Sequence, residues 1–123
     1  MDWILNNIQP VLIVSGVLTF SMISMMLMPR FAQRFVFGEA AEGRVADLVS
    51  RSWGEMVAAS GLMLLYAAWH PETRLPILLY SIAGKTGFIV LTLSKGYRTP
   101  NAVIAMLGDA IMIALFAWYL LAA

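Results

Sequence analysis

A stretch of membrane-spanning length with a single charge in its middle constrains this chain more than any other feature. Residues 75–93 read LPILLYSIAGKTGFIVLTL, and Lys85 is the charged residue among them. A helix of about 20 apolar residues is long enough to cross a bilayer. A charge at the bilayer centre costs about 3 kcal/mol on insertion scales. Lys85 therefore either has a partner at its own depth or takes part in a function.

The rest of the chain is also mostly apolar. Of the 123 residues, 61% are hydrophobic and 12% are charged, about half the charged fraction of a soluble domain. The apolar residues fall into runs that predict spans at about residues 8–28, 51–69, 75–93 and 101–121. We therefore expect an all-α protein, an integral membrane four-helix bundle that forms a single transmembrane domain over residues 1–123.

Several classes of site are excluded by residue counts. The chain has no cysteine, so it has neither disulfides nor thiolate metal sites. Its single histidine, His70, rules out a metal or haem site that needs two imidazoles from one chain. The net charge of +1 gives no reason to expect nucleic acid as a partner. We expect no metal and no cofactor.

The polar segment 29–50 lies between the first two expected spans. Aromatic rings alternate there with arginines, a pattern typical of a segment at the membrane surface, where rings lie at headgroup depth and guanidinium groups contact phosphates. These interface candidates are Phe31, Arg34, Phe35 and Phe37. From Glu39 onward the apolar spacing predicts a short amphipathic helix that continues into the second span. The segment is either a connector lying on the cytoplasmic face of the membrane or a surface for a partner.

The distribution of basic residues predicts the orientation of the chain. One side of the expected bundle carries Arg30, Arg34, Arg44, Arg51, Lys95 and Arg98, and the opposite side carries Arg74 alone. Lys and Arg are enriched in cytoplasmic loops. We therefore expect a multi-pass protein of the inner (plasma) membrane with both termini on the non-cytoplasmic side.

The second expected span combines small residues with two charges. Gly54, Ala58 and Gly61 follow one face, and such a stripe lets a neighbouring helix approach closely. Arg51 and Glu55 are four residues apart and share a face, so we expect them to form an ion pair near the cytoplasmic interface.

The polar residues of the spans converge on one level. Lys85 lies about ten residues before Lys95, and Asp109 lies about nine residues after Pro100. At 1.5 Å per residue, both reach a depth of about 15 Å, the bilayer midplane. The third and fourth spans form an antiparallel hairpin, so these two residues can meet. The candidates for a ligand site or a proton relay are Lys85, Asp109, Glu55, Arg51, Thr19 and Ser81. The pair is either a salt bridge that fixes helix register or part of a polar pocket or relay.

A short pattern in the middle of the chain gives a resemblance to a known group. Arg51-x-x-Gly54 and Gly61-Leu62 are followed by Pro71-Glu72-x-Arg74 and an apolar helix. This arrangement resembles small four-helix membrane proteins of the DoxX-like group. The resemblance implies an inner-membrane four-helix bundle, and some members of the group are accessory subunits of redox systems. It implies no catalytic residues.

Three classes of function remain open on these observations. The first is an accessory or scaffold subunit of a larger membrane complex, or a small protein that binds a lipophilic molecule. The second is a proton-coupled transporter, which four helices could form only as a homo-oligomer. The third is a membrane enzyme for a lipophilic substrate, with Glu55 or Asp109 as acid or base and Lys85 as electrostatic stabiliser. We assign no catalytic residue, and the expected partner common to all three classes is the lipid bilayer.

Overall fold

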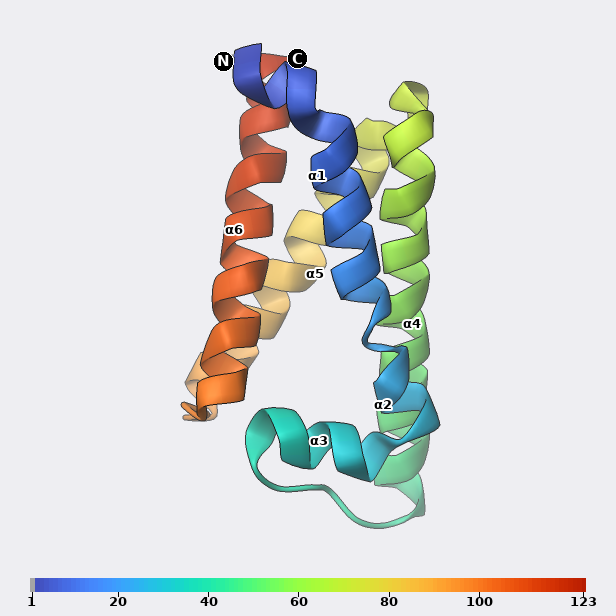
Figure 1. Cartoon of the computed structure of the whole chain (residues 1–123). Helices are drawn as coiled ribbons and strands as arrows, with labels where there is room; N and C mark the ends of the chain where they lie inside the picture. The colour runs from blue at the N-terminus through green and yellow to red at the C-terminus, as the bar shows by residue number, and fades with distance from the viewer. Residues whose placement is uncertain (1) are drawn as a thin grey trace.

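The computed structural model describes residues 2–123, and these residues are helical throughout apart from short turns (Figure 1). No strand occurs among them, which confirms the all-α class. The elements in chain order are α1 (Asp2–Phe20), α2 (Ile23–Leu27), α3 (Pro29–Phe37), α4 (Arg44–Trp69), the 3-10 turn η1 (Pro71–Thr73), α5 (Arg74–Ser94) and α6 (Pro100–Ala122).

Three stretches of the described chain are long and apolar enough to cross a membrane. They are Asp2–Leu27, Pro71–Ser94 and Pro100–Ala122. They contain most of the first expected span and all of the third and fourth. The first is interrupted at residues 21–22, where the chain turns between α1 and α2. The second expected span, 51–69, lies within the long helix α4, which is more polar than the other three.

The segment 29–50 differs from its prediction. Its helices are α3, which begins at a proline and ends at Gly38, and the first residues of α4. Residues 39–43 are not helical, so the expected helix begins at Arg44 and not at Glu39, but it continues into the second expected span as predicted. Gly38 and Gly43 bound this turn with φ of 81° and 106°, a region that glycine adopts without steric cost. These two residues explain why the chain leaves one helix and starts another there.

Close approach of backbones holds α4 against α1 and α2. A Cβ built on Gly61 would lie 2.5 Å from the backbone nitrogen of Phe20, and one on Gly54 would lie 2.6 Å from that of Met26. Gly16 on α1 faces Gly61 in the same way. Gly54, Ala58 and Gly61 are all buried. The predicted stripe of small residues is therefore confirmed, and its neighbour is the first helical stretch.

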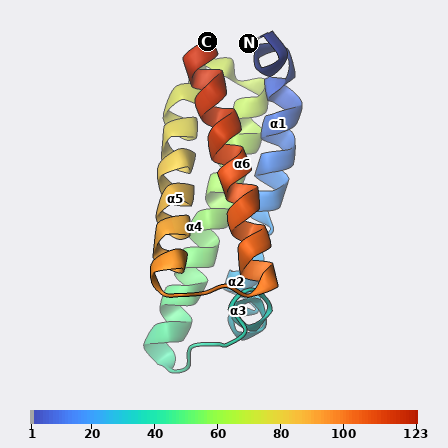
Figure 2. The same cartoon turned by 90° about the vertical axis from the view of Figure 1, so that its left-hand side faces the viewer.

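The tightly packed core lies at one end of the molecule. Its residues come from the beginning of α1, the end of α4, the beginning of α5 and the end of α6, which meet at the end where both termini lie (Figure 1). They include Ile4, Ile8, Leu12, Leu64, Leu78 and Phe116. At the opposite end α3 runs across the molecule, below α5 and α6 in Figure 1 and at the level of the first turns of α4, and it is seen almost end-on in Figure 2. One half of the bundle is thus filled by apolar side chains, and α3 lies across the end of the other half.

Candidate functional site

A cavity of about 460 Å³ occupies the half of the bundle opposite the packed core. Its walls come from α1, α4, α5 and α6, and residues of α3 close one end. The lining residues are Leu18, Thr19, Ser21, Met22, Val36, Phe37, Trp53, Met56, Val57, Ser60, Tyr80, Ser81, Gly84, Lys85, Phe88, Ile104, Ala105, Gly108, Asp109 and Met112. Cavities of 300–1,000 Å³ with a mostly apolar lining are typical binding sites for small molecules.

Lys85 is the centre of the polar part of the cavity. Its Nζ donates to Asp109 Oδ1 at 3.1 Å and to Thr19 Oγ1 at 3.0 Å. The salt bridge confirms the pairing predicted from matched depth, and Thr19 lies at the same level as expected. Lys85 is 9% exposed, so Asp109 supplies its counter-charge and the Thr19 hydroxyl supplies a second hydrogen bond in place of water. A buried charge needs such pairing to be tolerated.

Ser81 adds an unpartnered hydroxyl to this polar part. It lies one turn before Lys85 on α5, lines the cavity and is 4% exposed. Among residues 2–123, no partner hydrogen-bonds its Oγ. Leaving a buried hydroxyl unpaired costs about 1–3 kcal/mol. A ligand atom in the cavity that accepts from or donates to Ser81 would recover that cost.

Aromatic side chains form the cavity wall on the side of α3. The Trp53 and Phe88 rings stack with centroids 6.2 Å apart, and Phe37 of α3 approaches Phe88 at 6.4 Å. Met22 and Met56 lie in the same lining, and thioether side chains adapt to irregular apolar shapes. This end of the cavity suits a flat or flexible apolar group.

The charges of the lining cancel. Lys85 and Asp109 are its charged residues, and they form one ion pair. A charged ligand would have to compete with that pair or remain uncompensated in an apolar surrounding. The site therefore favours a neutral molecule.

Side chains from the α5–α6 connection and the first turn of α6 hold α3 against the cavity. Asn101 Nδ2 donates to the Phe35 carbonyl at 2.7 Å, and Thr99 Oγ1 donates to the Val36 carbonyl. Just beyond α3, the Tyr97 hydroxyl donates to Glu39 Oε1 at 2.7 Å. These contacts fix α3 as the closure of one end of the cavity.

Two of the predicted site residues lie outside the cavity. Arg51 pairs with Asp47, its Nε 2.9 Å from Oδ2, so the expected pair with Glu55 is wrong. Glu55 is exposed on α4 and contacts neither Lys85 nor any other charged group among the described residues. Both acids lie four residues from Arg51, and Asp47 in the first turn of α4 is the one that pairs with it. The cavity thus contains Lys85, Asp109, Thr19 and Ser81 of the predicted set.

The interface candidates divide between two surroundings. Phe31 and Phe35 are 62% and 59% exposed, and Arg34 is exposed with them. Phe37, predicted to lie at the interface too, instead lines the cavity and packs edge-on against Tyr97 at 5.0 Å. It lies at the last position of α3, where the helix meets the α5–α6 connection.

The aromatic wall and one structural arginine were not recognised in the sequence. Trp53 and Phe88 are ordinary span residues in sequence, and only the packing of α4 against α5 brings them together. Arg74 was counted only for its charge, but it is buried and bonds the backbone of α4. Its Nε donates to Ala67 O at 2.8 Å and its Nη2 to Ala68 O at 2.9 Å. A basic residue within a turn of a helix C-terminus is a signal for such a cap.

Within residues 2–123 no group of three or more His, Asp or Glu side chains lies close enough together to hold a metal ion. No family model, curated protein or solved structure matches this chain. The resemblance to the DoxX-like group therefore stays a prediction.

Proposed function

We propose that this protein is a multi-span membrane protein whose central cavity binds a small, neutral, lipophilic molecule. The three apolar stretches support the membrane setting. In this proposal α4 also crosses the membrane, as the second span, because it extends over the same height as α1, α5 and α6 (Figure 1) and its part within 52–69 carries one charge, Glu55. The excess of basic residues near α3 and the α5–α6 connection supports a cytoplasmic position for that end.

The observation that carries the proposal is the contrast between the two halves of the bundle. One half is packed around side chains such as Phe116 and Leu12 that are fully buried. The other holds a 460 Å³ cavity that ends in Lys85 and an unpartnered Ser81 hydroxyl. Protein interiors are normally packed to crystal-like density, so a hollow of this size with an unsatisfied polar group is typical of a binding site.

The lining defines the chemistry of the ligand. Its apolar body lies among Trp53, Phe88 and the methionines, and its polar group faces Lys85 and Ser81. A carbonyl or hydroxyl oxygen meets both requirements, because it accepts a hydrogen bond from either donor without adding charge. We therefore expect a lipophile with at least one oxygen and no net charge.

Two glycines in the cavity wall provide the test. A Cβ added at Gly84 or Gly108 would meet no atom within 4 Å, and both residues line the cavity. We therefore expect leucine at either position to be accommodated and to occupy part of the cavity. Gly87 is equally open but does not line the cavity, so Gly87→Leu is the matched control.

We would measure binding of prodan, a neutral fluorophore with one carbonyl oxygen, to protein in lipid nanodiscs, by energy transfer from the tryptophans. The wild type and Gly87→Leu should give a saturable signal that Trp53→Phe reduces. Gly84→Leu and Gly108→Leu should weaken saturable binding by about tenfold or more, since they occupy the site. Equal binding by all the glycine variants would contradict the proposal. Mass spectrometry of solvent extracts from the purified wild type would then identify the natural ligand.

Glu55 favours a second function, that of an accessory subunit in a larger membrane complex. It is exposed on α4 within the expected span, and a carboxylate facing lipid is costly unless it is paired. A basic group of another protein would satisfy it. Native electrophoresis after extraction in mild detergent should show a larger assembly that Glu55→Lys disrupts. Glu42→Lys, which changes an exposed acid in the 38–43 turn, should leave the assembly intact, and finding only free wild-type protein would exclude this function.

A further inference from the structure

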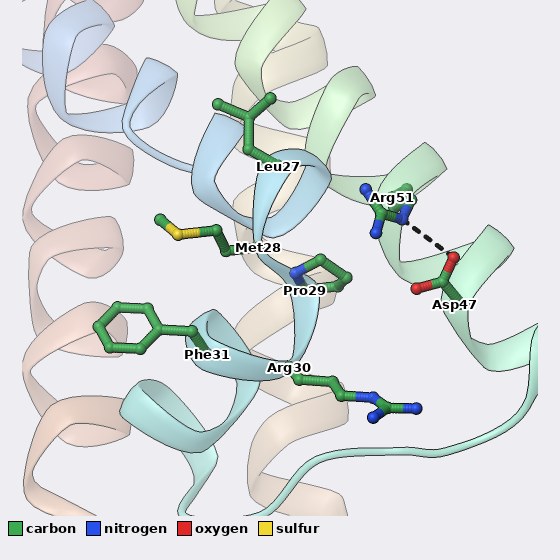
Figure 3. Close-up of a pocket in the computed structure, with 7 residues that line it drawn as sticks. All are labelled: Leu27, Met28, Pro29, Arg30, Phe31, Asp47 and Arg51. Carbon is green, nitrogen blue, oxygen red and sulfur yellow. Dashed lines mark hydrogen bonds and ion pairs between the residues drawn. The ribbon is translucent and has the colours of Figure 1, made fainter.

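A second hollow, of about 350 Å³, lies where α2 meets α3 beside the first turns of α4 (Figure 3). It shares no residue with the central cavity. Its lining residues are Leu27, Met28, Pro29, Arg30, Phe31, Asp47 and Arg51. Two arginines thus face a hollow whose other walls are mostly apolar.

Arg51 is held in place on two sides. Its Nε donates to Asp47 Oδ2 at 2.9 Å and its Nη1 to the Met26 carbonyl at 2.7 Å. Its Nη2 has no hydrogen-bond partner among residues 2–123. Holding the rest of the guanidinium in this way orients the remaining donors before any ligand arrives, which lowers the entropic cost of binding.

Arg30 supplies the second cation. It forms no hydrogen bond or ion pair with the described residues, and in Figure 3 its side chain extends on the same side of the α2–α3 junction as Arg51 and Asp47. With Asp47 counted, these three side chains carry a net charge of +1. The guanidinium group binds phosphate oxygens in a bidentate manner.

The opposite side of the junction is apolar. Met28 and Phe31 project away from the arginines (Figure 3), and both are more than half exposed, as is Leu27. Exposed apolar groups next to cations suit a ligand that is itself anionic at one end and apolar at the other.

The depth of the hollow agrees with that of lipid headgroups. Gly61 of α4 packs against Phe20, the neighbour of Thr19, and so lies at the level of the Lys85 pair. Arg51 precedes Gly61 by ten residues, which is about 15 Å of helix. Half the thickness of the hydrocarbon core is also about 15 Å. With Lys85 at the midplane, Arg51 reaches the level where the phosphates of one leaflet begin.

We infer that this hollow binds the phosphate of an anionic phospholipid, with an acyl chain lying over the exposed Leu27 side chain. The net positive charge selects against zwitterionic lipids, because their ammonium group would lie close to the arginines. The inference rests on the membrane placement proposed above, but it is independent of the ligand in the central cavity.

The test compares lipid adducts by native mass spectrometry of the full chain in mild detergent. The additives are phosphatidylglycerol, phosphatidylcholine and inorganic phosphate. The wild type should bind phosphatidylglycerol in preference to phosphatidylcholine and should retain no inorganic phosphate. Arg30→Gln should weaken the phosphatidylglycerol adduct by about tenfold, which corresponds to the loss of a charge-assisted hydrogen bond. Because Arg30 forms no hydrogen bond or ion pair with the described residues and is exposed, this variant should fold normally.

Arg44→Gln is the matched control, since it removes one charge on the same side of the molecule but does not line the hollow. It should bind phosphatidylglycerol as the wild type does. An equal loss in Arg44→Gln would overturn the inference in favour of diffuse attraction, and equal binding of inorganic phosphate would assign the site to a free anion. Equal binding of phosphatidylcholine would also overturn it. Gly84→Leu should retain the lipid adduct, so failure of one proposal is distinguishable from failure of the other.

Discussion

The Lys85–Asp109 pair can serve stability, ligand binding or both, and mutation separates these roles. Removing one partner, as in Asp109→Leu, leaves a buried lysine without its counter-charge and should destabilise the protein by about 3 kcal/mol. Changing both, to Met and Leu, removes the unpaired charge and should restore most of that stability. Unfolding by sodium dodecyl sulfate in mixed micelles measures the difference.

The same double variant tests the role of the pair in the cavity. It should fold but should bind prodan more weakly, since the carbonyl of the probe has lost the Lys85 donor. A folded double variant with unchanged binding would assign the pair to helix register alone.

Arg74 should be essential to the closed end of the bundle. The Arg74 guanidinium donates to two carbonyls of α4, and its Cζ lies 5.7 Å from the centre of the Tyr119 ring on α6. Through these contacts Arg74, on α5, joins α4, α5 and α6. Arg74→Met leaves those carbonyls without a donor and should cost about 2–3 kcal/mol. Arg74→Lys should recover only part of this, because an ammonium group lacks the planar fork. Thermal unfolding in detergent measures both, and a wild-type melting temperature for Arg74→Met would contradict this role.

For single residues, the level along the helix could be predicted from sequence, but the neighbour toward which a side chain points could not. The level of Lys85, Asp109 and Thr19 follows from counting residues along helices of fixed rise. The partner of Arg51 depends on which side of α4 meets α2, and an acid lies four residues away in both directions. Spacing alone gives the two acids equal weight, so the wrong one was predicted.

At the scale of elements, the packing of α1 against α4 requires glycine at position 61, because one added carbon atom there would clash with the backbone of α1. Gly61→Ala places a methyl group 2.5 Å from the Phe20 nitrogen, so the helices must separate. The expected cost is about 1–3 kcal/mol, typical of overpacking. Gly87→Ala meets no atom within 4 Å and should be neutral or stabilising. Chemical unfolding of the two variants gives the comparison, and equal stability would show that α1 and α4 are not held by this approach.

The elements themselves were predicted to different degrees. The three apolar helices stand out because their hydrophobicity is continuous. The turn at 38–43 was missed because apolar residues continue at helical spacing through it, and the left-handed glycines that bound it were not weighed. The position of α3 depends on Thr99 and Asn101, more than 60 residues away in the chain, and no local pattern contains that information.

For the whole molecule, we expect the attachment of α3 to weaken at high pH. The hydrogen bond to Glu39 and the negative charge of that residue raise the pKa of Tyr97 above its usual value of about 10. A raised pKa in the folded state means that the Tyr97 contact stabilises the protein fully below pH 10. That contribution is lost as the pH rises through the raised pKa.

Ultraviolet titration of tyrosine ionisation checks this prediction. The difference between the wild type and Tyr97→Phe gives the curve of Tyr97 alone. Glu39→Gln should shift that curve toward lower pH, because it removes the charge that opposes ionisation. A curve that does not move would show that the contact with Glu39 does not persist in solution.

The hollow half of the bundle lay beyond sequence reasoning. Whether four helices close over their whole length or diverge at one end is decided by the sum of all their side-chain contacts. The sequence places Trp53, Phe88 and Ser81 on helices. Whether a cavity remains between those helices depends on the packing of all the surrounding side chains, which the positions of single residues do not give.

The way in which α3 is held has a consequence for how this protein can evolve. Thr99 and Asn101 donate to the main-chain oxygens of α3, which every amino acid possesses. Most substitutions in α3 therefore leave this anchorage intact, apart from changes at Gln33, whose side chain bonds Ser50 of α4 and the Ala41 amide. The positions of α3 that line neither hollow are free to drift in sequence, and selection should fall on the two anchors, on Gln33 and on Phe37. A population of such proteins could thus acquire new ligand preferences at the closure without first losing the fold.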